Sequence, residues 1–483
     1  MPRVQIVPSM VNGVIGGVSY RVAPPDSVRK AVNFTFDDEI GSATTRLGMD
    51  ILGGGRIVAE DNEVLGLYNF VDSEAGPHSR LIAAVNEPAD GSASLYYLDG
   101  AAWTGGVANS TGLLAGAKVR FDTFLDSVVA VNGNSCRSWN GNPGSGWLVS
   151  GGPFDLDNMP VGSLVRVYKD QVIVAGVSGA PDTLYISSIP TGGAVSWTTN
   201  NREITVNPED SSNITALGEI AGVLVVLKRF GFYTWNNRAT EPDQLCGVGC
   251  SSQESVCVGG DMMFFFNEEG VWATKGSFPV LISDKVRPWI EGMSASNYEN
   301  VAAHSDNRHL WVSIGDCTVD GIDYTNVVLR YSLKSKEWAV LSYSREFRNI
   351  VRYQSSGSVL AVAGDTTARV LQLDSGYDDD GDQIAYELET HDQDAGSPAI
   401  EKTINRLMYA FGDGFSGESV QVMENGGDWR EIGHLNGEVA QMQANGVRGS
   451  RLRFRIAGVR ASGRLTFRGF EIPELEPMGH AAR

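Results

Sequence analysis

Short apolar runs separated by polar turns recur from about residue 63 to about residue 378. In each unit an apolar run is followed by a polar turn, a second apolar run and a third run that ends on an aromatic residue. The turns include Lys169-Asp170-Gln171, Gly259-Gly260-Asp261 and Asp306-Asn307-Arg308. Asp, Asn and Gly tolerate the positive φ angles of tight hairpins. The pattern therefore predicts successive antiparallel β-strands.

The units repeat at about 35 to 50 residues, which suits one four-stranded sheet of a β-propeller. Such sheets have two apolar faces and bury them by packing radially against each other. We predict an all-β chain with a propeller of about seven blades over residues 61–378, although two unrelated β-sandwiches would give a similar pattern. A tryptophan recurs near the unit ends, and packing between blades explains it better than carbohydrate stacking does. These residues are Trp103, Trp147, Trp197, Trp235, Trp272 and Trp338.

The pattern changes after a short acidic stretch between Asp374 and Asp382. Alternating strands follow over residues 379–475, which predicts a small C-terminal β-sandwich, with a tail over 476–483. Residues 1–60 form an N-terminal segment before the first unit. We expect part of it to close the propeller as a borrowed strand, and docking on a neighbouring molecule is the alternative.

The acidic stretch is the most site-like motif in the chain. Asp374, Asp378, Asp380 and Asp382 alternate around Gly381 and could surround a hard cation such as calcium. A calcium-binding EF-hand loop requires Glu at its twelfth position, which is Ala385 here. A solvated hinge between domains is therefore the favoured interpretation, calcium is the alternative, and we predict no cofactor.

A second candidate is a run of alternating residues in the predicted sandwich. Arg451, Arg453 and Arg455 alternate with apolar residues, so one face of the strand is basic. A solvated strand face is the favoured interpretation. An anion site and a docking face for an acidic neighbour are the alternatives.

The charge of the chain limits its partners. The formal net charge is −20, and the sequence from about residue 400 onward is near neutral, so the acidic excess precedes it. A surface of this sign repels nucleic acid, which argues against wrapping DNA or reading its sequence. An odd number of cysteines without a secretory signal indicates reduced thiols. The five are Cys136, Cys246, Cys250, Cys257 and Cys317.

The sequence contains none of the common catalytic motifs that we considered. It contains no GxSxG nucleophile elbow, no GxxxxGK[ST] phosphate loop, no HExxH and no sialidase-type Asp box. No apolar run approaches the roughly 20 residues of a membrane span. We therefore predict a non-catalytic protein.

Three stretches resemble the tail hub or nozzle family of bacteriophages, also called packaged-DNA stabilisation proteins. The first contains GGVSY, then PPD, then AVNFTFDDEIGSATTRLG from Ala31 to Gly48; it is similar to the family's opening, with an Asn, a Gly-Ser turn and a final Arg-x-Gly. The second runs from APDTLYISSI to GVGCSSQESVCVGGDMMFFFNEEGVW and ISDKV. The third is the change from the acidic turn to IAYELETH and a final domain ending RLTFRGFEI.

The resemblance implies a β-propeller virion protein of the phage tail, assembled in the host cytoplasm. It implies a ring of identical copies, a hexamer, below the portal, which retains packaged DNA and forms part of the ejection channel. Its partners would be other tail proteins on the portal or adaptor side and on the tail-tip or fibre side. Double-stranded DNA would pass without sequence-specific binding. A tail-tip or baseplate part of a long-tailed phage is one alternative, and a propeller glycosidase or carbohydrate-binding module is another.

Overall fold

The computed structural model describes residues 4–7, 9–59, 62–72, 78–87, 90–210, 212–237, 239–355, 357–394, 398–411, 416–436, 439–460, 462–472 and 475–477. Strands dominate this part of the chain, and α1 (Arg287–Glu291) is its one α-helix. The predicted all-β class is confirmed. None of the described helices has the length and apolar character of a membrane span.

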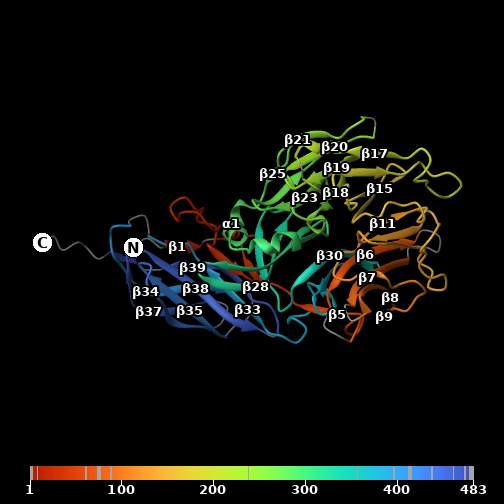
Figure 1. The fold of residues 1–483 in the computed structure, drawn as a ribbon. Coiled ribbons are helices and arrows are strands. Elements are labelled where there is room, and N and C mark those ends of the chain that lie inside the picture. The colour runs from red at the N-terminus through yellow and green to blue at the C-terminus, as the bar shows by residue number, and fades with distance from the viewer. Residues whose placement is uncertain are drawn as a thin grey trace.

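Seven sheets, each formed mainly by consecutive strands, make up the propeller seen on the right of Figure 1. The first two are β6 (Val64–Asp72), β7 (His78–Glu87), β8 (Ser92–Asp99), β9 (Ala102–Thr104) and β10 (Leu113–Leu114), then β11 (Arg120–Phe124), β12 (Ser127–Val131) and β13 (Cys136–Trp139). The third and fourth are β14 (Leu164–Tyr168), β15 (Gln171–Ala175), β16 (Thr183–Ile186) and β17 (Arg202–Thr205), then β18 (Ile214–Ile220), β19 (Val223–Lys228), β20 (Gly231–Trp235) and β21 (Asp243–Cys246).

The remaining blades follow the same plan. The fifth and sixth are β22 (Cys257–Gly259), β23 (Met262–Asn267), β24 (Gly270–Thr274) and β25 (Val280–Leu281), then β26 (Ala302–Ser305), β27 (His309–Val319), β28 (Ile322–Ser332) and β29 (Trp338–Ser342). The seventh is β30 (Phe347–Ser355), β31 (Ser358–Asp365), β32 (Val370–Leu373) and β5 (Met49–Leu52).

The ring closes through strands from both ends of the propeller sequence. Neighbouring blades touch through their first strands in the order β6, β11, β14, β18, β22, β26 and β30, and β30 then packs against β6. The outer strand of the seventh blade is β5 from the N-terminal segment, which pairs antiparallel with β32 and places Ile51 opposite Leu371. One blade therefore combines strands from the beginning and the end of the propeller.

Each pair of neighbouring blades encloses its own hydrophobic cluster. Trp235 and Trp338 are fully buried in such clusters, whereas Trp103 and Trp272 are partly buried. The recurrent tryptophans thus serve inter-blade packing, as the sequence pattern indicated. The cluster between blades six and seven is larger, because it continues into the C-terminal domain.

The C-terminal domain contains two sheets and is not made from C-terminal residues alone. Strands of the N-terminal segment pair with β39 or with each other, a role beyond the predicted closure of the propeller or docking on a neighbour. Red N-terminal strands accordingly lie among the blue strands in Figure 1. The first sheet comprises β1 (Val4–Val7), β3 (Phe34–Thr35), β4 (Ala43–Thr45), β34 (Lys402–Phe411), β37 (Val439–Gly449), β39 (Thr466–Ile472) and β40 (Leu475–Pro477). β40 includes the first two residues of the tail predicted over 476–483, and the rest of that tail lies outside the described residues.

The second sheet of this domain is continuous with the sixth propeller blade. β2 (Lys30–Val32) pairs parallel with β29 and antiparallel with β33, so that nine strands form one sheet. The strands on the sandwich side of β2 are β33 (Ile384–Glu389), β38 (Leu452–Arg460), β35 (Ser416–Glu424) and β36 (Trp429–Asn436). The N-terminal segment therefore joins the propeller and the sandwich through main-chain hydrogen bonds.

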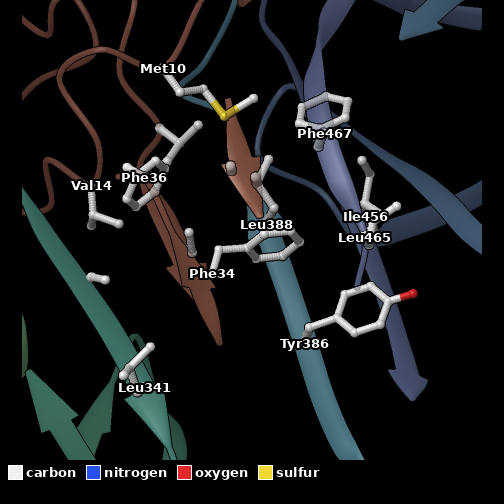
Figure 2. Packing of buried hydrophobic residues seen from close by; sticks show 14 of the residues in the cluster. Met10, Val14, Phe34, Phe36, Leu341, Tyr386, Leu388, Ile456, Leu465 and Phe467 are labelled. Carbon is white, nitrogen blue, oxygen red and sulfur yellow. The ribbon is translucent and has the colours of Figure 1, made fainter. Parts of the chain in front are cut away.

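A shared core reinforces this connection. Figure 2 shows Phe34 between Leu341 of the sixth blade and Tyr386 of the sandwich. Phe34 and Tyr386 meet edge to face with ring centroids 5.7 Å apart. Since the N-terminal segment, a blade and the sandwich bury the same side chains, the two domains form one packed body.

Candidate functional site

The innermost strands of the propeller surround a cavity of about 420 Å³. Every blade contributes lining residues, and the walls are mixed: apolar side chains alternate with five charged side chains and one imidazole. The charged or imidazole residues are Arg120, Arg166, Arg352, Glu219, Glu254 and His304. The cavity is of the size that accepts small molecules. It is too small for a DNA duplex, whose major groove alone is about 12 Å wide.

An ion pair crosses this cavity between distant blades. Arg120 of blade two donates from Nε and Nη2 to the two carboxylate oxygens of Glu254, at 2.8 and 3.1 Å. Glu254 lies in the short helix η3 (Gln253–Ser255), just before blade five. Burial by itself would raise the pKa of Glu254, but the charge and hydrogen bonds of Arg120 outweigh burial and hold the pKa below its usual value. The ion pair therefore connects opposite sides of the propeller.

We expect Arg120→Ala to destabilise the protein by about 2 kcal/mol, because it leaves the Glu254 carboxylate buried without its main partner. Denaturant unfolding followed by tryptophan fluorescence measures the change. The matched control is Arg229→Ala, which removes an exposed pair with Glu268 and should cost under about 1 kcal/mol. Equal effects of the two substitutions would show that the cavity pair is no more important than a surface pair.

A second site lies at the junction of the propeller and the sandwich. Arg46, whose side chain is fully buried, donates from both terminal nitrogens to the two oxygens of Asp379 at 2.7 and 2.6 Å. Its Nε donates to Asn33 Oδ1 at 2.8 Å, and its remaining donors reach the carbonyls of Leu47 and Ser342. All five guanidinium N–H groups therefore have acceptors.

The residues around Arg46 are equally constrained. Asn33 has a φ of +63° and donates from Nδ2 to the carbonyl of Ala385 in the sandwich. Gly48 packs so closely that a Cβ on it would lie 1.7 Å from the carbonyl oxygen of Asp378. We call Asn33, Arg46, Gly48 and Asp379 the junction cluster. It links the N-terminal segment, the blade-six strand end and the acidic turn.

The acidic turn does not gather its carboxylates around one point. Asp374 pairs with Arg330 at 3.2 Å, Asp380 pairs with Arg345 at 3.1 Å, and Asp378 accepts from the backbone of Gly381 at 2.9 Å. Among the described residues, no group of three or more His, Cys, Asp or Glu side chains is placed to hold a metal ion. The calcium alternative for Asp374, Asp378, Asp380 and Asp382 thus finds no convergent ligand set here. The turn is only partly solvated, because Asp379 is buried whereas Gly376, Tyr377, Gly381 and Asp382 are exposed.

The basic strand face is largely occupied by the chain's own acidic residues. In β38 the side chains alternate between buried and partly exposed as predicted. Arg453 pairs with Glu389 at 2.9 Å and Asp392 at 2.7 Å, and Arg455 pairs with Glu387 at 3.4 Å. A docking face for an acidic neighbour over Arg451, Arg453 and Arg455, one of the alternatives to a solvated strand face, stays a prediction. The neighbouring strand β33 supplies the acidic partner for two of the three, and Arg451 is exposed.

A histidine near the junction is held between two carboxylates. His309 Nδ1 lies 3.3 Å from Asp306, and its Nε2 contacts Asp37 of the N-terminal segment. Arg330 pairs with Asp37 at 2.7 Å and also with Asp374, so it connects the two carboxylates. Burial alone would lower the pKa of His309, but the hydrogen bonds to Asp306 and Asp37 outweigh burial and raise it. Burial alone would raise the pKa of the Asp37 and Asp306 carboxyl groups. Hydrogen bonds from His309 outweigh burial and lower both pKa values.

The raised pKa of His309 predicts a pH dependence of stability. A histidine with a raised folded-state pKa stabilises fully below its unfolded value, about 6.5, and loses the effect as pH rises through the folded value. Asp37 and Asp306 contribute above about 3.8 and lose their effect on acidification. We expect thermal stability to fall as the pH rises above about 6.5 and through the raised pKa of His309, and to fall less in His309→Gln. His434→Gln, at an exposed site, is the control. Identical pH profiles for wild type and His309→Gln would contradict this assignment.

The five cysteines are free thiols. Burial raises the pKa of Cys250, and it raises the pKa of Cys317 to about 12. Thiols that are this hard to ionise are inert packing groups rather than nucleophiles or metal ligands.

Comparison with known proteins adds little to this geometry. No family model matches the chain, and no curated protein matches it. Among solved structures, YCF48 from Cyanidioschyzon merolae aligns with a TM-score of 0.39 and 10% identity, covering 66% of this chain and 98% of that one. The AfRom2 CNH domain aligns with a TM-score of 0.38 and 12% identity, covering 69% and 99%. At such values the likeness says nothing about function.

Several residues of the junction cluster and of the cavity ion pair do not belong to a recognisable sequence motif. Asp379 lies in the acidic stretch but was not among its four calcium candidates, and Glu254 precedes a strand without a recognisable motif. Arg46 and Gly48, by contrast, are the final Arg-x-Gly of the N-terminal stretch. That resemblance was the one signal that pointed to the junction.

Proposed function

We propose that this protein is a structural component of a bacteriophage tail, a nozzle or hub ring below the portal that retains packaged DNA and forms part of the ejection channel. The proposal starts from the resemblance of the N-terminal stretch, the blade phrases and the final domain to that family. The junction cluster is the structural observation that supports it best.

The junction cluster gives the resemblance a physical meaning. The Asn and the Arg-x-Gly of the N-terminal stretch correspond to Asn33, Arg46 and Gly48, which meet at one buried point. Together with the continuous nine-stranded sheet, they leave no free linker between propeller and sandwich. A part that holds DNA under pressure between other tail proteins requires such a rigid body, whereas a flexible tandem of domains would yield under load.

The DNA path of this proposed ring lies between copies and outside the propeller cavity. That cavity is small and is crossed by the Arg120–Glu254 pair. The formal charge of −20, with its excess before residue 400, favours an acidic propeller surface toward the DNA. Like charges would let a duplex slide without adhering. The partners would then be identical copies in a ring, a hexamer by resemblance, with portal or adaptor proteins above and tail-tip or fibre proteins below.

The alternatives receive less support. A tail-tip or baseplate part of a long-tailed phage would also use a rigid propeller, and only its place in a particle separates it from a nozzle. A propeller glycosidase requires a carboxylic acid and a second carboxylate at suitable separation. In the cavity, Glu254 is held ionised by Arg120, which leaves Glu219 as the other carboxylate lining it. A carbohydrate-binding role of the cavity would require exposed aromatic faces there, whereas Tyr68 and Phe121 of the cavity wall stack on each other.

Sedimentation and negative-stain electron microscopy of the purified full chain test the proposed ring. We expect closed rings of several copies, alone or with a portal-side partner protein. A panel of glycosides provides the complementary assay, and we expect no turnover. Monomers at every concentration and with every candidate partner, or catalytic turnover of a glycoside, would contradict the proposal.

A further inference from the structure

The propeller cavity has a charge arrangement that neither the ring function nor the packing of the blades explains. Arg120 and Glu254 neutralise each other. Arg352 of β30 also lines the cavity, is partly buried, and among the described residues has no hydrogen-bonding or ion-pairing partner. An unpaired guanidinium group that lines a cavity offers five N–H donors in a geometry that suits a carboxylate or phosphate oxyanion.

One further basic side chain, Arg166, extends this positive character. Arg166 lines the same cavity, and its closest carboxylate, Asp122, is 3.9 Å away. Asp122 already accepts hydrogen bonds from the backbone of Val167 and Thr123, so it is only a weak partner for Arg166. His304 adds no positive charge near neutral pH, because burial, with a smaller effect of the nearby Arg352, lowers its pKa to about 4.

The remaining cavity residues indicate the size and character of an occupant. Glu219 is the one cavity carboxylate without a basic partner among the described residues, and it opposes an anion. Leu67, Leu217, Val258 and Ile350 supply apolar wall. With about 420 Å³ available, the space suits a small molecule with an apolar part and one anionic group.

We propose that the propeller cavity is a binding site for a small organic oxyanion, a carboxylate or phosphate compound, held by Arg352 and Arg166. The site is independent of the ring function, since it faces the propeller axis and not the space between copies. An occupant would contact several blades at once and would stabilise the folded propeller by mass action.

Isothermal titration calorimetry of the full-length protein with citrate and, separately, inorganic phosphate tests this site. Citrate presents carboxylates and phosphate presents a phosphoryl oxyanion, so the two titrations distinguish the sources of the anionic group. We expect one saturable site per chain for at least one probe. Arg352→Gln should weaken it by about tenfold or more, the loss expected for a hydrogen bond to a charged group.

Three variants make the test specific. Arg166→Gln should weaken the binding as well, whereas Glu219→Gln should strengthen it because it removes the opposing charge. Arg308→Gln, on the exposed turn before β27, should leave binding unchanged. Circular dichroism of each variant confirms folding, which we expect to persist because Arg352 has no partner to lose. No saturable binding of either probe, or equal weakening by Arg352→Gln and Arg308→Gln, would overturn the proposal.

Discussion

Replacing Arg46 by Met is expected to destabilise the protein by about 3 to 5 kcal/mol, the usual cost of removing one partner from a buried ion pair. The substitution keeps an unbranched side chain of similar length, so the loss comes from Asp379, which stays buried without its bidentate donor. Asn33 and the carbonyl of Ser342 lose hydrogen bonds at the same time. Arg46 also covers the ring of Tyr343 at 3.9 Å, a contact that Met only partly replaces.

Denaturant unfolding of the purified full-length variant measures this loss. Arg308→Met, at an exposed position, is the matched control and should change stability by less than about 0.5 kcal/mol. The double variant Arg46→Met with Asp379→Asn isolates the pair, because the second substitution removes the stranded carboxylate charge. We expect the double variant to be less unstable than the sum of the single variants. Additive effects would show that Arg46 and Asp379 do not act as a unit.

Gly48→Ala is the second substitution with a large expected effect. The new methyl group would lie 1.7 Å from the oxygen, 2.6 Å from the carbon and 2.7 Å from the nitrogen of Asp378, all of them backbone atoms. The backbone cannot move aside easily, since Gly48 donates to Gly376 and accepts from Ser375. Overpacking typically costs about 1 to 3 kcal/mol and more where nothing can yield. We expect at least about 3 kcal/mol, or a strongly reduced yield of folded protein.

The control for Gly48→Ala is Gly247→Ala. At Gly247 a methyl group would meet the carbonyl of Phe230 at an ordinary 3.8 Å. Removing the conformational freedom of a glycine there should be neutral or slightly stabilising. Thermal melts and soluble yield of both variants, prepared in parallel, provide the comparison. If Gly48→Ala melts at the same temperature as Gly247→Ala, the close contact between the N-terminal segment and the acidic turn is not required.

The strands and blades could be predicted because they follow from local patterns. Alternating apolar runs and hairpin turns, such as Lys169-Asp170, lie within one unit of sequence, and both of these turn residues adopt positive φ angles. The recurrent tryptophans mark the same repeat. For this reason about seven blades and a terminal sandwich were predictable from the sequence alone.

The junction could not be derived from local patterns, because its contacts join residues far apart in sequence. Arg46 and Asp379 are separated by 333 positions. The alternation in β38 correctly placed Arg453 and Arg455 on one face, but it did not reveal that β33 brings Glu389 and Glu387 to them. The acidic turn suggested calcium for the same reason, since its arginine partners lie elsewhere in the sequence, Arg330 in β28 and Arg345 between β29 and β30.

Cryo-electron microscopy of phage particles that contain this protein would locate it directly. We expect a ring of identical copies below the portal, with each propeller and sandwich in the fixed relative orientation of Figure 1 and DNA passing between copies. A position at the tip of a long tail would support the tail-tip alternative instead. Particles in which the protein is absent from the tail, or in which the sandwich is detached from the propeller, would contradict the account.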